Sequence, residues 1–204
     1  MIILRNSNEN EIILNFLLGE IRSERFGEKL LSIIKEKNID IDIILNADLN
    51  NDLENNLRRE ILADFRGYGK NSGLFENFPK IKSYKFAVAC KDDLEKIKYI
   101  NYSYWEELSK GSFSPFVAAE TIKEGIEIYG VSNKPFFKGA KELVNGKKFL
   151  PCILLTSDCE KYIILEGHSR MTVYGLEVDK FDNTEFYILE CDEKELKKWN
   201  GEEI

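Results

Sequence analysis

The spacing of hydrophobic and polar residues changes several times along this chain, and each change predicts a different element. Between residues 9 and 64, apolar residues recur mostly at helical spacing, which predicts a mainly helical stretch. Four runs rich in β-branched and aromatic residues predict strands near residues 85–90, 151–155, 161–165 and 184–189. Between and after these runs, helical spacing predicts helices near residues 115–125, 133–146 and 192–199.

These elements together predict an α+β fold in which helices surround a mixed sheet. We expect residues 1–64 as a mainly helical N-terminal extension and residues 65–204 as the α/β domain. Within the extension, the alternation that begins at Ile39-Asp40-Ile41-Asp42 predicts a short strand. A helix is expected after it, from about residue 51 to residue 65.

The strand at residues 162–165 leads into a turn that predicts an anion site. After Glu166-Gly167, the apolar spacing of Ser169–Leu176 suits a short helix, with Ser169 as its N-cap. A strand that turns through glycine into a helix leaves backbone N–H groups unpaired, and the positive end of the helix dipole lies beside them. Arg170 in the first turn suits bidentate binding of a phosphate or carboxylate.

The same corner resembles the core of the ParB/sulfiredoxin-like superfamily. Phe149–Leu155 and Tyr162–Leu165 precede Glu166–Arg170, which is similar to that family's D/E/G-G-x-H/R-R loop at a helix start. The resemblance covers roughly residues 113–190 of the 204. It implies a ParB/sulfiredoxin-like mixed sheet whose loop holds nucleotide phosphates, as in partition-type CTP-binding proteins, sulfiredoxins and ADP-dependent serine kinases.

Three positions depart from the pattern of that family. His168 stands where sulfiredoxins have their reactive cysteine, which excludes sulfiredoxin chemistry. Ser169 stands where many members have histidine, and Glu166 stands where aspartate is frequent. These changes are compatible with a phosphate cradle, but they do not specify a reaction.

We therefore expect the ligand to be a nucleotide (ATP, ADP or CTP) or a small phosphorylated molecule. The expected binding residues are those of the corner, Thr172 beyond it, and one residue of a second loop: Gly167, His168, Ser169, Arg170, Thr172 and Arg66. Glu166 is the candidate general base and Mg²⁺ ligand, and His168 is a candidate proton carrier. In the alternative, Glu166 only accepts backbone hydrogen bonds and Ser169 only caps the helix.

Arg66 begins the second loop of interest, Arg66–Phe75. Three glycines lie there among basic and aromatic residues, which suits a backbone that approaches a ligand. We expect residues 66–73 and 166–172 to border one cleft; the alternative is a plain surface connector. The aromatic residues between 99 and 105 are expected in the core rather than as a base-stacking platform.

Two main classes of function follow from these expectations. The first is phosphoryl transfer or nucleotide hydrolysis with Mg²⁺ at the Glu166–Arg170 loop. The second is a non-catalytic nucleotide- or DNA-binding module of regulatory or partition type, with the N-terminal helices contacting a protein partner. A ParB-like nuclease is a third, weaker alternative.

Composition argues against several classes of partner and site. With 29 basic and 36 acidic residues, the chain has a net charge of -7, which disfavours nucleic acid as a partner. No apolar run approaches the roughly 20 residues of a membrane-spanning helix. The residues Met1–Asn6 lack the features of a signal peptide, so we expect a cytoplasmic protein without membrane contact. The four cysteines have no CxxC spacing and predict no zinc site.

Overall fold

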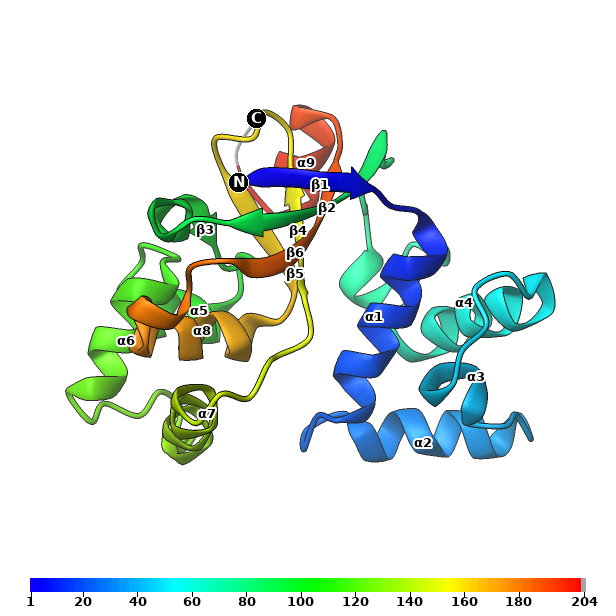
Figure 1. Cartoon of the computed structure of the whole chain (residues 1–204), viewed down its shortest axis with the longest axis horizontal. Coiled ribbons are helices and arrows are strands. Elements are labelled where there is room, and N and C mark those ends of the chain that lie inside the picture. The colour runs from blue at the N-terminus through cyan, green and yellow to red at the C-terminus, as the bar shows by residue number, and fades with distance from the viewer. Residues whose placement is uncertain (203–204) are drawn as a thin grey trace.

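The computed structural model describes residues 1–202, which form a six-stranded mixed sheet with helices on both faces (Figure 1). The strands are β1 (Ile2–Asn6), β2 (Ser83–Ala89), β3 (Ile97–Lys98), β4 (Cys152–Thr156), β5 (Tyr162–Glu166) and β6 (Thr184–Glu190). The α-helices are α1 (Glu9–Ile21), α2 (Gly27–Glu36), α3 (Asp42–Leu45), α4 (Asp52–Arg66), α5 (Ser103–Leu108), α6 (Pro115–Lys123), α7 (Lys134–Val144), α8 (His168–Leu176) and α9 (Glu193–Trp199). Short 3₁₀ turns are η1 (Gly73–Phe75), η2 (Lys91–Lys96) and η3 (Val178–Lys180). The predicted α+β fold is confirmed.

The strand order is β1-β2-β6-β4-β5-β3, so the four predicted strands form the middle of the sheet. β4 runs parallel to β6 and antiparallel to β5, with Leu154 opposite both Ile188 and Ile164. The two edge strands, β1 and β3, were not predicted. β1 pairs antiparallel with β2, and the two-residue β3 pairs parallel with β5.

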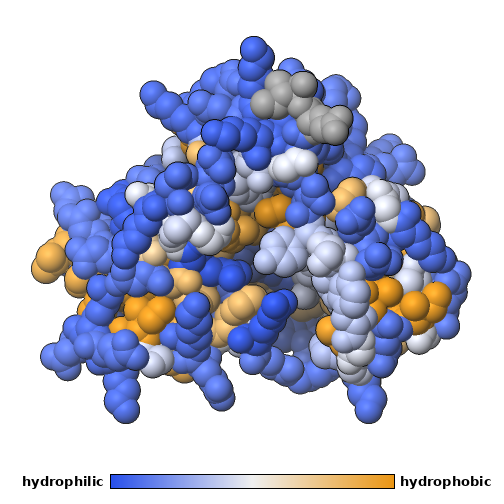
Figure 2. Space-filling model, turned by 180° about the vertical axis from the view of Figure 1, so that it is seen from behind, coloured by the Kyte–Doolittle hydropathy of each residue, from blue (hydrophilic) through white to orange (hydrophobic). Residues whose placement is uncertain are grey.

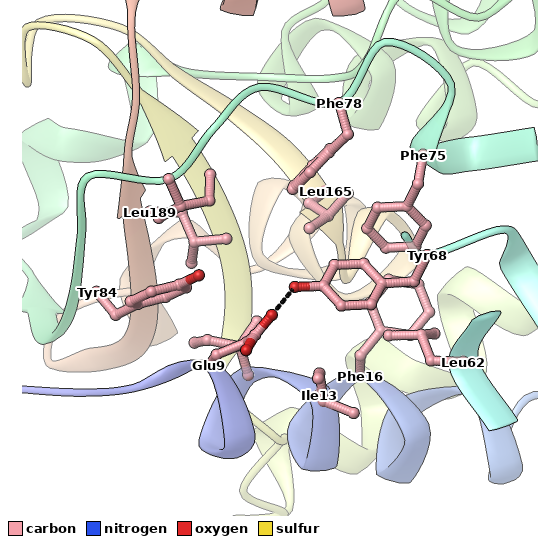
Figure 3. A pocket seen from close by; sticks show the side chains of 12 residues that line it. Glu9, Ile13, Phe16, Leu62, Tyr68, Phe75, Phe78, Tyr84, Leu165 and Leu189 are labelled. Carbon is pink, nitrogen blue, oxygen red and sulfur yellow. Dashed lines mark hydrogen bonds between the residues drawn. The ribbon is translucent and has the colours of Figure 1, made fainter. Parts of the chain in front are cut away.

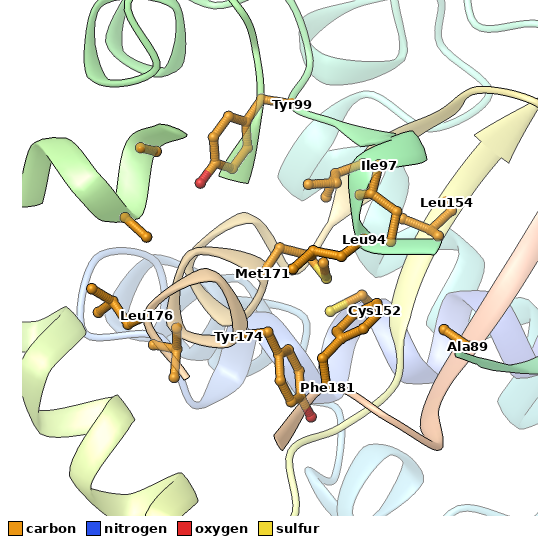
Figure 4. Close-up of a cluster of buried hydrophobic side chains, with 14 of the residues drawn as sticks. Ala89, Leu94, Ile97, Tyr99, Cys152, Leu154, Met171, Tyr174, Leu176 and Phe181 are labelled. Atoms are coloured by element: carbon orange, nitrogen blue, oxygen red, sulfur yellow. The ribbon is translucent and has the colours of Figure 1, made fainter. Parts of the chain in front are cut away.

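The central strand β4 is buried on both faces, because all five of its residues are buried. Cys152 and Leu154 join a hydrophobic cluster with α5–α8, in which Met171 and Tyr174 of α8 take part (Figure 4). The alternate residues Ile153 and Leu155 join a second cluster, formed with α1–α4 and α9.

Residues 1–64 are part of this packed core. They form four helices joined by turns, together with β1, which extends the sheet at one edge. Phe16 and Leu17 of α1 and Leu62 of α4 are buried in the same cluster as Leu165 of β5. The expected helical extension therefore covers the second face of the sheet.

Two expectations for this N-terminal part have different outcomes. The helix expected from about residue 51 is confirmed as α4, and the Asn51 side chain caps it by accepting hydrogen bonds from the N–H groups of Leu53 and Glu54. The strand expected from residue 39 is wrong, because the chain forms α3 there. Only Ile44 of α3 is buried, so the apolar alternation before it matches no sheet face.

A small void lies where α1 and α4 meet the sheet (Figure 3). Its volume is about 10 Å³, and its lining is largely apolar, with Phe16, Phe75 and Leu165 among its residues. The Tyr68 hydroxyl donates a hydrogen bond to Glu9 at its rim. Such a volume holds about one water molecule at most. This void is therefore an imperfection of packing and too small for a nucleotide.

Within residues 1–202, no helix combines the length and the apolar character that crossing a membrane requires.

Candidate functional site

The corner between β5 and α8 depends on glycine at position 167. Gly167 has a φ of 103°, in the left-handed region that side chains disfavour. A Cβ atom there would also overlap the Cys152 Sγ of the neighbouring strand β4. The chain can therefore pass from β5 into α8 so closely against β4 only because this residue has no side chain.

The first turn of α8 leaves backbone N–H groups without partners within the helix. Met171 is the first residue whose N–H is bonded within the helix, to the Gly167 carbonyl at 2.9 Å. The N–H groups of His168, Ser169 and Arg170 precede this bond and have no partner within the helix. Gly167 occupies the N-cap position, so the expectation that Ser169 caps the helix is wrong. Ser169 lies in the first turn and is exposed.

Arg170 points back toward β4 and β5 and binds groups of the chain itself. Its Nη1 donates to the carbonyls of Leu150 at 2.6 Å and Pro151 at 3.2 Å, and its Nη2 donates to the Glu166 carboxylate. The two side chains of this ion pair are only 16% and 13% exposed. Burial opposes the charge on Arg170, but the nearby Glu166 carboxylate outweighs it and raises the pKa of Arg170. Glu166 can therefore act as a base or bind a metal ion only if it leaves Arg170.

A second ion pair adjoins the first, and it comes from the N-terminal layer formed by helices α1–α4. Arg66, at the end of α4, donates from Nη2 to Glu20 Oε1 at 2.6 Å, and Glu20 is only 4% exposed. Burial raises the pKa of Glu20, and the positive charge of Arg66 lowers it by less, so the pKa remains raised. A Cβ atom on the preceding Gly19 would lie 2.7 Å from Glu166 Oε1, so α1 reaches the corner directly.

His168 is the first residue of α8 and packs against aromatic rings. Its ring lies parallel to that of Trp105, with centroids 5.3 Å apart, and to that of Tyr99, 6.0 Å away. Burial lowers the pKa of His168 to about 3, with further contributions from the positive charges of Arg66 and Arg170. The imidazole is therefore neutral at physiological pH. Its Nε2 is buried and has no hydrogen-bond partner among the described residues.

The structure thus brings most of the predicted site residues together, including Arg66, whose charge acts on the same imidazole as that of Arg170. Thr172 is placed differently: it is fully buried, donates to the His168 carbonyl at 2.9 Å and shares a hydrogen bond with the Tyr99 hydroxyl at 2.7 Å. The loop after Arg66 folds on itself, since a Cβ at Gly67 would overlap Ser72.

Two residues that lie around the β5–α8 corner were not among the predicted site residues. Glu20 lies in a helix that gave no chemical signal in the sequence. Trp105 belongs to the aromatic group that the sequence placed in the core, and it does pack against that core. Only the fold shows that it also covers His168.

The corner lies at the junction of the two helical layers. From behind, the lower half of the molecule has two lobes, α1–α4 on one side and α5–α8 on the other, with a hollow between them that contains hydrophilic residues (Figure 2). Across this junction, Lys138 Nζ of α7 lies 3.9 Å from Glu24 Oε1 of the α1–α2 turn.

The part of the chain described by the structure contains no group of three or more His, Cys, Asp or Glu side chains arranged to hold a metal ion. Among the residues described above at the corner, Glu20 is the only carboxylate besides Glu166, and each of the two is paired with an arginine. Mg²⁺ usually keeps several waters and takes further ligands from substrate phosphates. The protein side chains around Glu166 therefore do not form a Mg²⁺ site by themselves.

No protein-family model matches this chain, and no curated protein or solved structure matches it significantly.

Proposed function

We propose that the protein binds a nucleotide or another phosphorylated small molecule at the Gly167–Arg170 corner. The observation that carries this proposal is the uncapped start of α8, where three successive N–H groups lack partners within the helix. The exposed Ser169 leaves this helix start accessible. The resemblance to the ParB/sulfiredoxin-like superfamily, whose loop holds nucleotide phosphates, supports ATP, ADP or CTP as the first candidates.

Two versions of this proposal differ in whether the ligand reacts. In the catalytic version, Glu166 leaves Arg170 and acts as the general base for phosphoryl transfer or nucleotide hydrolysis. In the non-catalytic version, the ion pair stays closed and the protein only binds, as a regulatory or partition-type module does. The mutual pairing of Glu166 and Arg170 favours the non-catalytic version. The neutral His168 likewise suits a hydrogen bond better than proton transfer near neutral pH.

The variant Ser169→Asp tests the binding site without disturbing its ion pairs. A carboxylate in the first turn stabilises a helix start by about 0.3–1 kcal/mol and competes with any external anion for the same N–H groups. We expect the variant to fold normally and to bind nucleotide at least about tenfold more weakly, a loss of roughly 1.4 kcal/mol. Isothermal titration with ATP, ADP and CTP, each with and without Mg²⁺, measures this effect.

Asn50→Asp is the matched control, because it adds the same charge at an exposed position just before α4. Its affinity for nucleotide should equal that of the unmodified protein. Equal affinity of the Ser169→Asp variant would place the ligand elsewhere, and no binding of any of the three nucleotides would refute the proposal.

A phosphate-release assay separates the catalytic version from the non-catalytic one. If Glu166 is the base, Glu166→Gln should abolish turnover and leave nucleotide affinity within a few fold. If the protein only binds, the unmodified protein should release no phosphate from any nucleotide that it binds in the titration.

A further inference from the structure

A second, larger cavity lies at the free edge of the sheet, beside β3. Its volume is about 260 Å³, against about 10 Å³ for the void between α1 and the sheet. Its polar lining comes from four separate parts of the chain: Lys98 and Asn101 at and after β3, Ser112 before α6, Lys161 before β5, and Asn200 and Glu202 after α9. A volume many times that needed for one water molecule suits a small ligand.

The charges in this cavity are unbalanced. Lys161 Nζ lies 2.7 Å from Glu202 Oε1, which also accepts a hydrogen bond from Asn200 Nδ2 at 2.6 Å. Lys98, in contrast, has no ion-pair partner within residues 1–202. Burial lowers the pKa of Lys98, and the nearby positive charge of Lys161 lowers it further, whereas the Glu95 carboxylate raises it without reversing the shift. Among the residues that line the cavity, two ammonium groups therefore share one carboxylate, and the local field attracts an additional negative charge.

The polar wall of the cavity is held in place by hydrogen bonds. Asn200 is only 6% exposed, and its Oδ1 accepts a hydrogen bond from the Asn101 N–H at 2.9 Å. On the opposite side, the Phe113 carbonyl accepts a hydrogen bond from the Tyr99 N–H at 2.8 Å. These bonds tie the segment after β3 to the end of α9 and to the loop before α6. A wall fixed in this way needs little further ordering when a ligand binds.

We propose that this cavity binds a small organic anion, with a carboxylate or phosphate group between Lys98 and Lys161. Asn101 provides a neutral amide donor beside the two ammonium groups, and Phe113 provides an apolar wall, while the Ser112 hydroxyl donates its proton to the Ser109 carbonyl at 2.7 Å. The Glu202 carboxylate already occupies part of the anion position, where it binds Lys161 and Asn200. An external anion therefore competes with Glu202 and displaces it from Lys161. This site is separate from the Gly167–Arg170 corner and does not depend on it.

Lysine NMR tests the proposal directly. Reductive methylation with ¹³C-formaldehyde gives each lysine a resolved signal and retains its charge. Signals are assigned with Lys98→Arg and Lys161→Arg variants, and the protein is titrated with inorganic phosphate and with succinate at constant ionic strength. We expect the signal of Lys98 to shift in a saturable way, and the pKa of Lys98 to rise when the anion is bound. The anion that binds with the higher affinity shows whether the site prefers a phosphate or a carboxylate ligand.

Two substitutions give effects of opposite sign. Lys98→Met should weaken anion binding at least tenfold, followed through the Lys161 signal, because it removes the unpaired ammonium group. Glu202→Gln should strengthen binding several-fold, because it removes the competing carboxylate. Lys35→Met, on the exposed face of α2, is the control that removes the same charge far from the cavity. The Ser169→Asp variant should bind the anion as the unmodified protein does, which separates this site from the corner.

A Lys98 signal that does not saturate with either anion would overturn the proposal. So would unchanged binding in the Lys98→Met variant, or weaker binding in the Glu202→Gln variant.

Discussion

One face of the central sheet is covered by α5–α8, and the other is covered by α1–α4 together with α9 (Figure 1). Each face buries its own hydrophobic cluster, and neighbouring residues of β4 serve the two clusters in turn. The two layers come from different parts of the sequence. Helices α5–α8 lie in the chain among the strands that they cover, whereas α1–α4 all precede the four central strands.

Where the two layers meet, the contacts change from apolar to charged. The ion pairs Glu166–Arg170 and Glu20–Arg66 lie side by side at this junction, and the positive charges of both arginines lower the pKa of His168. Apolar burial therefore fixes each layer on the sheet, while charged groups gather at the junction together with Trp105, which packs against both clusters. The proposed binding corner lies at this junction, where a ligand would contact both layers.

The largest effect is expected from Arg170→Met. The substitution leaves the Glu166 carboxylate largely buried without its partner and removes the Arg170 donor from the Leu150 carbonyl, whereas the Pro151 carbonyl keeps Asn15 Nδ2. Removing one member of a buried pair costs about 3–5 kcal/mol. Urea denaturation should show this loss in the free energy of unfolding.

The double variant Glu166→Gln/Arg170→Met is the control for that result. It removes both charges, so most of the lost stability should return if the cost comes from the unpaired carboxylate. A loss below about 1 kcal/mol in the single variant, as is usual for exposed pairs, would mean that the pair does not organise the junction.

A pair of core substitutions compares the two faces directly. Leu154 and Leu155 are adjacent in β4, both fully buried, and belong to opposite clusters. Leu154→Ala and Leu155→Ala should each cost about 2–5 kcal/mol, because each leaves a cavity in a packed cluster. Urea denaturation should show one cooperative transition for both. A much smaller loss for Leu155→Ala would mean that α1–α4 are only loosely attached to the sheet.

These two faces also explain which strands were predictable from the sequence. β4 and β5 are buried on both sides, so they are nearly continuous apolar runs that stand out from their surroundings. β1 was missed because all five of its residues are exposed and carry no alternating pattern. β3 has only two residues, too few for any periodicity. The wrong strand before α3 arose from isoleucines that alternate without a sheet to cover.

The site was predictable only where its signal is local. Gly167 and the helix start after it follow from neighbouring residues, so the corner could be placed. The pairing of Arg170 with Glu166, and the approach of Glu20 and Trp105, depend on how distant segments pack. For that reason the sequence suggested an arginine available to a phosphate, whereas the fold pairs it with Glu166 and two backbone carbonyls.

The junction should also respond to pH through His168. Its pKa in the folded protein is about 3, below the ordinary value of 6.5. His168 therefore takes up a proton in the unfolded chain as the pH falls below about 6.5, whereas in the folded protein its imidazole stays neutral until about pH 3. Stability from this group is complete above pH 6.5 and is lost as the pH falls, by up to about 1.4 kcal/mol per pH unit. We expect a loss of about 2 kcal/mol between pH 7 and pH 5.

His168→Gln is the control for this pH effect. His168 is the only histidine in the chain, so the variant should lose much less stability between pH 7 and pH 5 in urea denaturation. The raised pKa of Glu20 acts in the opposite direction, but it is present in both proteins and cancels in the comparison. Equal pH dependence of the two proteins would show that the imidazole accepts a proton in the folded state.

The smallest effect is expected from Asn15→Ala, which removes a single hydrogen bond between α1 and the residue before β4. Asn15 is 5% exposed, and its Nδ2 donates to the Pro151 carbonyl at 2.9 Å. That carbonyl keeps Arg170 Nη1 as a second donor at 3.2 Å, so the loss should be only about 1 kcal/mol. Asn55→Ala is the comparison within the N-terminal layer, where Asn55 donates to the Leu49 carbonyl and also accepts from the buried Arg58, so its loss should be larger.

Hydrogen exchange distinguishes the two asparagine variants by where protection is lost. Asn15→Ala should speed exchange in α1 and leave α6–α8 unchanged, because it loosens the N-terminal layer from the junction and does not touch the other cluster. Asn55→Ala should speed exchange in α3 and α4 instead. If Asn15→Ala speeds exchange equally in α1 and α8, the two layers open as one unit. The polar junction would then be as firmly coupled as the apolar faces, and the contrast between them would not hold.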